Sequence, residues 1–434
     1  MLLRFKIKNF LSFNKETTFD MFPNIKREKF SHHIYSDMDV PLLKQAAIYG
    51  ANGSGKSNFI KAISFLSNFI IDDNFLKNID LDSYFFQLTP EKQHKISFEI
   101  EFFHRDKYYL YVVSIDKKEV YEKLSLSGLN KTEDKLIFER QGENINSPYL
   151  QNENSAKQLL SLNPLSSLLP LNKKYPVLTE NNSKKVHEWF SNKLEIIGIN
   201  SRIPILINIM SIDDKRLLKF ANEIFENIGI GIGSLDIVNT PFDKWITNQK
   251  NATIIQNILA QERESGILSS TENNRNIFNI SVQKGVKTVQ EFLFNQIGES
   301  GYRKKMKITD QSDGTVRLLT LIPAIYEAMY QNKTIFIDEI DNSIHPNLMF
   351  ELLKFYAHNK SNGQLIFTTH TTMLLNQQEL VRPDEVWFTE KNEGSTRIYS
   401  LNDFKLHNTL NIENGYLDGR YGGIPLIEEI SADV

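Results

Sequence analysis

The feature that most restricts how this chain can fold is residues 50–57, GANGSGKS, which match the pattern G-x-x-x-x-G-K-[S/T] in full. A short apolar run, residues 45–49, precedes the match, and a helix-compatible stretch begins near Ser57. Successive backbone N–H groups of such a turn surround phosphate groups, and the positive end of the helix dipole faces them. The segment therefore predicts a phosphate-binding loop in an α/β fold, and a chance glycine-rich turn is the weaker interpretation.

Individual positions of this loop have predicted roles. Lys56 is expected to contact the β- and γ-phosphates of a nucleotide and to act in catalysis, and Ser57 is expected to ligate Mg²⁺. The other nucleotide-binding candidates of this segment are Gly50, Asn52, Gly53, Ser54, Gly55 and Asn58.

Polar side chains also follow two later apolar runs, residues 334–337 and 365–367. Short apolar runs that end in polar residues are typical of buried parallel strands with chemistry at their C-terminal ends. Asp338 is expected to hold the magnesium shell and Glu339 to polarise the attacking water. His370 is expected to hydrogen-bond the γ-phosphate or that water. Surface acids that cap a strand and a structural histidine are the alternatives, and the phosphate-binding loop favours the catalytic interpretation.

Residues 310–315, DQSDGT, open another predicted helix. Ser312 and Gly314 offer a hydroxyl and backbone N–H groups at a helix N-terminus, which suits a phosphate ligand. In isolation, an ordinary helix cap would be the better interpretation.

Composition excludes several classes of site. The chain has 434 residues and no cysteine, which excludes disulfides, thiolate zinc sites, iron–sulfur clusters and cysteine nucleophiles. Its net charge of −3 gives no overall basic excess for nucleic-acid binding. No uncharged apolar run reaches the roughly 18 residues that span a bilayer, and the N-terminus lacks a signal-peptide core. A cytoplasmic protein without a membrane partner is therefore expected.

Three domains are predicted: 1–150, 151–275 and 276–434. Alternating apolar residues in 3–7 and 96–102, with β-formers over 108–115, predict an antiparallel sheet in the first domain. Prolines and an amphipathic pattern over 217–225 predict a mainly helical insertion in the second.

The motifs occur in an order that resembles ABC-type ATPase heads. They are residues 50–57, 312–315 (SDGT), 338–346 (DEIDNSIHP) and 368–370 (TTH). Residues 7–10, IKNF, look like the opening of the RecF, SMC and Rad-type heads.

The ending, residues 415–425, GYLDGRYGGIP, is similar to a bacterial AAA-type ATPase family of anti-phage systems. These systems are of the AbiL, Rlo and PARIS kinds, with Septu ATPases as more distant relatives. The resemblance covers residues 1–115 and 300–430.

This resemblance implies a P-loop ATPase head with a mixed sheet, an antiparallel β subdomain, ATP and Mg²⁺ as ligands, and a head-to-tail dimer. Across each ATP, Ser312 and Gly314 of one copy would face the other copy's Lys56, Ser57, Asp338, Glu339 and His370. Asp341 would couple the two sites, and Gln87 is the candidate for a magnesium-sensing glutamine. The sequence departs from transporter engines, which carry SGGQ in place of SDGT, and Leu11 replaces an arginine often found after Phe10.

The expected function is an ATPase that acts as sensor and scaffold in anti-phage defence. It would control a separate effector nuclease, Toprim-like or HNH, because this chain shows neither residue set. The alternative is a RecF- or SMC-like DNA-repair or chromosome-maintenance ATPase that binds DNA. The basic cluster Arg303, Lys304, Lys305 and Lys307 would suit it, although a solvated charged loop is the better interpretation of that cluster. A module that binds ATP without turnover is a third possibility, against which Glu339 argues. The trigger, the effector, a homo-oligomer larger than a dimer and the choice of ATP over GTP stay open.

Overall fold

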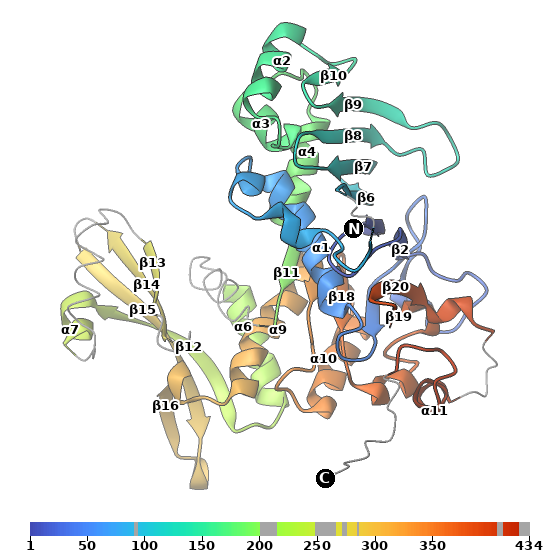
Figure 1. Ribbon diagram of the computed structural model, residues 1–434. Helices are drawn as coiled ribbons and strands as arrows, with labels where there is room; N and C mark the ends of the chain where they lie inside the picture. The colour runs from blue at the N-terminus through green and yellow to red at the C-terminus, as the bar shows by residue number, and fades with distance from the viewer. Residues whose placement is uncertain are drawn as a thin grey trace, which may run out of the picture. The chain divides into compact units, whose positions relative to one another are not determined.

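The computed structural model describes residues 1–90, 94–199, 215–247, 266–270, 276–283, 286–405 and 411–424. Two compact units make up the chain. Unit one consists of Met1–Gly198, Ala328–Ile340 and Phe350–Val434, and unit two consists of Ile199–Glu327 and Asp341–Met349. Figure 1 shows the order of the helices and strands, coloured from blue to red along the chain.

Unit one contains a six-stranded mixed sheet in the order β11-β17-β18-β5-β19-β20. The first five strands pair in parallel, and β20 returns antiparallel to β19. Every residue of β5, β17 and β18 is buried, as expected for parallel strands covered on both faces. The predicted buried parallel strands are confirmed, and a hairpin of β19 and β20 follows them. The bounds are β5 Gln45–Tyr49, β11 Leu194–Ile197, β17 Thr334–Ile337, β18 Gln364–Thr368, β19 Val386–Asn392 and β20 Ser395–Ser400.

A seven-stranded antiparallel sheet is the other large element of unit one, in the order β10-β9-β8-β7-β6-β1-β2. Burial alternates along β1 and β6, with the apolar side chains inside, as their sequence pattern predicts. The predicted antiparallel sheet is thus confirmed. The bounds are β1 Leu2–Lys8, β2 Thr17–Asp20, β6 Ile96–His104, β7 Lys107–Ile115, β8 Val120–Leu126, β9 Lys135–Gln141 and β10 Asn144–Asn146. A short ribbon pairs β3 (Ile34–Tyr35) with β4 (Leu42–Leu43).

Helix α1, Lys56–Ile71, lies between these two sheets. Its Phe59 ring stands 6.0 Å from Phe5 of β1, 5.1 Å from Phe19 of β2 and 6.2 Å from Phe336 of β17. Aromatic rings at these separations bury large apolar areas in contact with one another. The start of α1, which carries the predicted phosphate-binding loop, is therefore fixed by the core.

A buried ion pair joins the antiparallel sheet to the helices that follow it. Arg140 Nε donates to Glu122 Oε2 at 2.6 Å, and neither side chain is exposed. Glu122 also accepts from the Ser167 hydroxyl and the Leu168 N–H, at the start of α3. The helices of this region are α2 Glu153–Leu162, α3 Leu168–Lys174 and α4 Asn182–Glu188. Later in the chain lie α9 Asp313–Tyr330, α10 Pro346–His358 and α11 Ile412–Leu417.

Unit two contains a five-stranded antiparallel sheet in the order β12-β15-β14-β13, with β16 paired to β15. The predicted amphipathic helix near residue 217 is confirmed as α6. The bounds are α6 Lys215–Asn227, β12 Ile232–Pro241, α7 Phe242–Ile246, β13 Gly266–Ser270, β14 Asn276–Gln283, β15 Val286–Ile297 and β16 Arg303–Lys307.

The described residues of 151–275 form helices and also strands, and β12 of that range pairs with β15, which begins beyond residue 275. A mainly helical insertion there stays a prediction. The mixed burial along β12 explains why its sequence carries no clear strand alternation. The predicted domain boundaries at 150 and 275 stay predictions.

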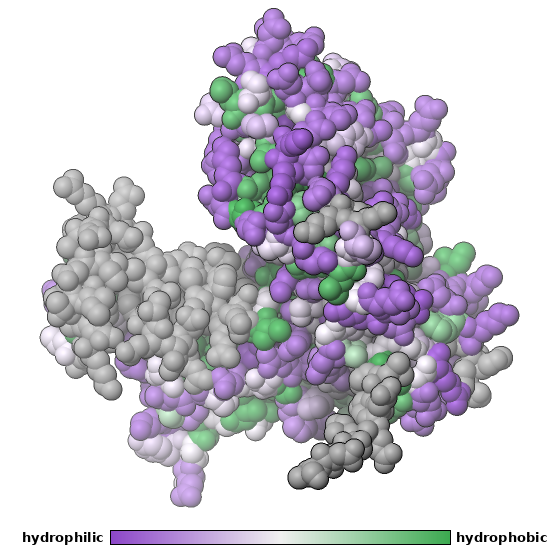
Figure 2. Space-filling view, viewed as in Figure 1, coloured by the Kyte–Doolittle hydropathy of each residue, from purple (hydrophilic) through white to green (hydrophobic). Residues whose placement is uncertain are grey.

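On the face seen in Figure 2, hydrophilic residues predominate and hydrophobic ones are scattered, which is normal for a folded chain. Among the described residues, no helix has both the length and the apolar character needed to cross a membrane.

Candidate functional site

The turn between β5 and α1 is the predicted phosphate-binding loop. Gly53 and Gly55 have φ of +77° and +114°, which residues with a side chain rarely adopt. Helix α1 begins at Lys56, directly after Gly55, with no side-chain cap from that residue. A helix N-terminus of this kind presents backbone donors and the positive end of the helix dipole to an anion. The backbone of this turn is therefore suited to phosphate.

Hydroxyl groups from distant parts of unit one hold this loop. Ser54 Oγ lies 2.7 Å from Thr389 Oγ1 on β19, and Thr389 donates to the Tyr49 carbonyl at 3.1 Å. Thr396 of β20 contacts both the Ser54 carbonyl and the Ser12 hydroxyl at 2.8 Å. The sequence analysis did not identify Ser12, Thr389 and Thr396, because no local motif marks them. Thr389 and Thr396 lie more than 300 residues from the loop in the sequence.

Lys56 folds back over its own loop. Its side chain is 5% exposed, and its Nζ donates to the Gly50 carbonyl at 2.8 Å and to the Ala51 carbonyl at 3.2 Å. Asn58, two residues further along α1, donates to the Ser12 hydroxyl at 2.8 Å. The ammonium group thus lies among the carbonyls of the turn that the sequence predicts to surround phosphate.

The acids and the histidine come together at the adjacent ends of β17 and β18. Asp338 is 5% exposed, and Glu339 follows it with φ of +49°. His370 Nε2 lies 3.9 Å from Glu339 Oε1, and both side chains are partly exposed. Since β18 pairs directly with β5, these side chains share one edge of the sheet with the loop after β5. The carboxyl edge of a parallel sheet is the usual place for a ligand in an α/β fold.

Gln87 is an exposed residue in the segment before β6. Its Nε2 donates to the Asp82 carbonyl at 2.8 Å and to the Phe85 carbonyl at 3.0 Å, both of which lie within five residues of it. Its role as a magnesium-sensing residue stays a prediction.

The remaining candidates belong to unit two. Ser312 Oγ accepts from the Thr315 N–H at 3.2 Å, which makes Ser312 the cap of α9. Gly314 packs so closely on the Ser343 backbone that a Cβ there would lie 2.7 Å from the Ser343 carbonyl oxygen. Asp341 lies in the turn after β17, and its backbone carbonyl accepts from the Ile344 N–H at 3.3 Å. All three residues belong to unit two.

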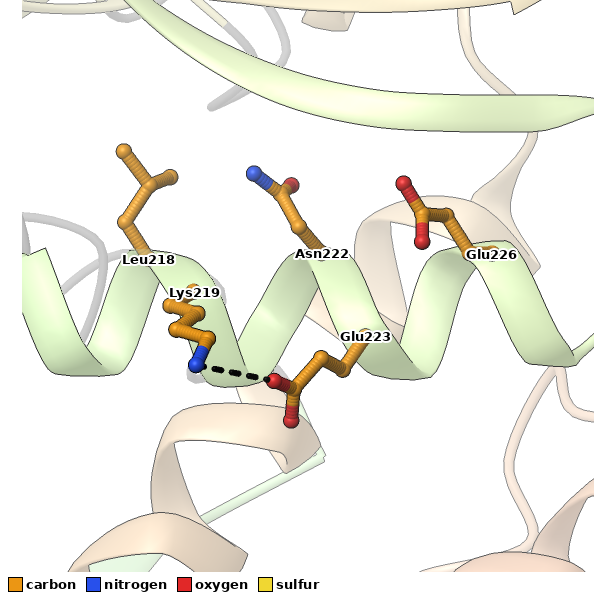
Figure 3. A pocket seen from close by; sticks show the side chains of 5 residues that line it. All are labelled: Leu218, Lys219, Asn222, Glu223 and Glu226. Carbon is orange, nitrogen blue, oxygen red and sulfur yellow. Dashed lines mark ion pairs between the residues drawn. The ribbon is translucent and has the colours of Figure 1, made fainter.

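Unit two also has an open hollow along α6, drawn in Figure 3. Lys219 and Glu223 form an exposed ion pair of 3.6 Å there, and Asn222 is bonded to Leu235 of β12. The hollow contains none of the candidate residues predicted from the sequence. Its lining residues are Leu218, Lys219, Asn222, Glu223 and Glu226.

Comparison with known proteins identifies one family. Residues 46–376 match the family described as "AAA domain, putative AbiEii toxin, Type IV TA system". No protein of curated function matches the chain.

Solved structures with similarity to the chain include heads of SMC proteins. One is an SMC head bound to the C-terminal winged-helix domain of ScpA, with 13% identity and a TM-score of 0.49 over 93% of this chain and 99% of that chain. The SMC head domain from Thermotoga maritima has 13% identity and a TM-score of 0.43 over 93% and 99%. An SMC head from Pyrococcus furiosus, bound to the C-terminal domain of ScpA, has 12% identity and a TM-score of 0.41 over 93% and 97%.

Proposed function

The chain belongs to this AAA-domain family of P-loop ATPases, and from that premise we propose that it binds ATP and hydrolyses it to ADP and phosphate. One observation carries the proposal. The loop after β5, the acids after β17 and the histidine after β18 lie at one edge of one sheet. Phosphate binding, charge stabilisation and activation of water all require such groups to converge on one substrate.

The residues present fit magnesium as well as nucleotide. Ser57 offers a hydroxyl and Asp338 a nearly buried carboxylate, and Mg²⁺ prefers oxygen ligands of this kind. When bound, Mg²⁺ neutralises charge on the β- and γ-phosphate oxygens.

Each side chain has a distinct task in the proposed reaction. Lys56 leaves the carbonyls of its loop and pairs with the β- and γ-phosphates. Glu339 orients the attacking water and accepts its proton, while His370, within 4 Å of that carboxylate, hydrogen-bonds the γ-phosphate or the water. The carboxylate and the imidazole thereby approach the water from two adjacent strands.

We further propose that ATP joins two copies head to tail. Ser312 and Gly314 of one copy complete the phosphate site of the other, and Asp341 couples the two sites. The capped N-terminus of α9 supports this assignment, because a hydroxyl and backbone N–H groups at a helix N-terminus suit a phosphate group.

The proposed biological role is that of a sensor and scaffold in anti-phage defence, which holds or releases a separate effector nuclease of Toprim-like or HNH type. The family description, with its AbiEii toxins and type IV toxin–antitoxin systems, and the resemblance of the ending to defence ATPases support this role. Phage plating with and without the neighbouring gene tests it. Resistance that survives loss of the neighbour rules out a separate effector encoded there.

The alternative of a DNA-repair or chromosome-maintenance ATPase has one structural feature in its favour, the exposed basic strand β16. Two of its four cations are already paired, Lys305 with Asp236 at 3.0 Å and Lys307 with Glu291 at 3.6 Å. Salt-dependent DNA binding that Arg303→Ala and Lys304→Ala together weaken would favour this alternative.

The decisive experiment measures the solution mass of Glu339→Gln with and without Mg²⁺ and ATP. Loss of the base slows hydrolysis while binding remains, so a two-copy complex accumulates and the mass doubles. Adding Ser312→Arg prevents the increase, whereas the matched exposed-helix variant Ser161→Arg leaves it intact. A monomer under all conditions contradicts the head-to-tail proposal. ATP binding by the wild type without phosphate release contradicts hydrolysis and favours a module that uses ATP without turnover.

A further inference from the structure

Thr368, the last residue of β18, contacts three consecutive residues after β17. Its hydroxyl donates to Asp338 Oδ1 at 2.7 Å and accepts from the Glu339 backbone N–H, also at 2.7 Å. Its backbone carbonyl accepts from the Ile340 N–H at 3.0 Å. Thr368 is fully buried. One residue of β18 therefore holds the whole turn that carries both acids.

The backbone of this turn has the geometry that these contacts require. In a regular strand, successive N–H groups point to opposite sides. Here the N–H groups of Glu339 and Ile340 both bind Thr368, and the chain achieves this with φ of +49° at Glu339. A long side chain seldom occupies that conformation, and it persists only where neighbouring groups fix it. The Thr368 hydroxyl is one of the groups that fix it.

We propose that Thr368 is a positioning residue for the nucleotide reaction: its hydroxyl fixes the rotation of the Asp338 carboxylate and, through the backbone, the direction of the Glu339 carboxylate. The inference rests on the proposed function, because it concerns the reaction at the same site. A group that donates to one oxygen of a metal-binding carboxylate restricts its rotation and orients the other oxygen. Thr368 thus acts on the acids without touching the substrate.

Two contacts connect the end of β18 with Glu339, one to its backbone and one to its carboxylate. Thr368 binds the backbone of Glu339, and His370, two residues later, approaches the Glu339 carboxylate at 3.9 Å. A displacement of the end of β18 therefore moves the base and the histidine together. Thr368 thereby keeps the Glu339 carboxylate and the His370 imidazole at a constant separation while nucleotide binds and leaves.

The test compares Thr368→Val, which removes the hydroxyl at nearly constant shape, with Thr368→Ser, which retains it. The matched control is Thr334→Val at the opposite end of β17, a fully buried threonine whose hydroxyl donates to Gln364 at 3.3 Å. Three quantities are measured for each purified variant: the dissociation constant for ATP without Mg²⁺, the turnover number, and the Mg²⁺ concentration at half-maximal turnover.

We expect Thr368→Val to lower turnover about 10- to 100-fold, the effect of losing a hydrogen bond to a charged group at the site of reaction. The Mg²⁺ midpoint rises, and Mg²⁺-free ATP binding does not change. Thr368→Ser restores both turnover and the Mg²⁺ midpoint, and Thr334→Val leaves both as in the wild type. If Thr368→Val does not fold, Thr368→Ala is compared with Thr368→Ser instead, because these two variants differ only in the hydroxyl group.

Wild-type turnover and Mg²⁺ midpoint in the folded Val variant overturn the proposal, and so does equal loss in the Val and Ser variants. Failure of the proposed function looks different, since the wild type itself then releases no phosphate. In that case the Mg²⁺ dependence of ATP binding still tests the role of Thr368. An identical dependence in the wild type and in Thr368→Val overturns that role.

Discussion

Gly55 and Thr396 are in such close contact that a Cβ at position 55 would lie 2.3 Å from Thr396 Oγ1. The same glycine has φ of +114°. Gly53, two residues earlier, also has a positive φ but faces open space. A side chain at Gly53 would therefore cause backbone strain alone, whereas a side chain at Gly55 would cause backbone strain and steric overlap.

We expect Gly53→Ala to destabilise the fold by about 1 kcal/mol through backbone strain. Gly55→Ala adds overlap with Thr396 and exceeds that loss by about 1–3 kcal/mol. Urea unfolding without nucleotide measures both. Equal losses would contradict the close packing of Gly55 on β20.

Lys56→Met should reduce ATP affinity at least about tenfold, because a charge-assisted contact with phosphate is lost. The rise in melting temperature that ATP gives the wild type should disappear with it. The control is Lys61→Met, an exposed lysine on the same helix. Thermal shift with and without ATP is the measurement, and a shift that survives in Lys56→Met rules out the phosphate contact.

Arg140→Met should cost about 3–5 kcal/mol of unfolding free energy, since it leaves the carboxylate of Glu122 buried without its cation. Arg420→Met removes an exposed pair with Asp418, and its cost should stay below about 1 kcal/mol. Chemical denaturation of the two variants gives the comparison. Similar losses would mean that Arg140 contributes packing rather than charge compensation.

Stability should depend on pH through His104. Burial lowers the pKa of His104 from 6.5 to about 4, with Arg105 and Lys193 adding to the shift, while Glu188 opposes it. Between these values the unfolded chain binds a proton that the folded chain does not, so stability falls as the pH decreases from about 6.5 to 4. Above pH 6.5 this group contributes no pH dependence.

His104→Phe should therefore flatten the acid side of the stability profile, by at most about 1.4 kcal/mol for each pH unit. The exposed His94 provides the control, since His94→Phe should leave the slope unchanged. The readout is the slope of the urea midpoint against pH. An unchanged slope in His104→Phe would show that another group carries the dependence.

The candidate site could be predicted largely from the sequence because its parts are contiguous. Gly50 to Ser57, Asp338 with Glu339, and His370 each follow a short apolar run, and strand pairing then brings the three segments to one edge. The groups that support them could not be predicted in this way. Thr368 and Thr396 acquire their roles only from pairing between strands far apart in the sequence.

Two parts of the fold also escaped the sequence patterns for physical reasons. Strand β12 has mostly half-buried residues, so its hydrophobic periodicity is weak, and its partner β15 is recognised only in the structure. Glu122 and Arg140 are fully buried, whereas their residue types predict the surface. Their burial depends on mutual pairing, which composition and periodicity do not reveal.

The strand order of the mixed sheet has a consequence for biosynthesis. Strand β5 emerges from the ribosome early, yet both of its neighbours, β18 and β19, are translated more than 300 residues later. Until then its apolar residues have no partner strands, a condition that favours aggregation and chaperone binding. A nascent chain that stops before β19 therefore has the whole predicted phosphate-binding loop but lacks the strand whose Thr389 contacts it, and we expect such a chain to bind chaperones.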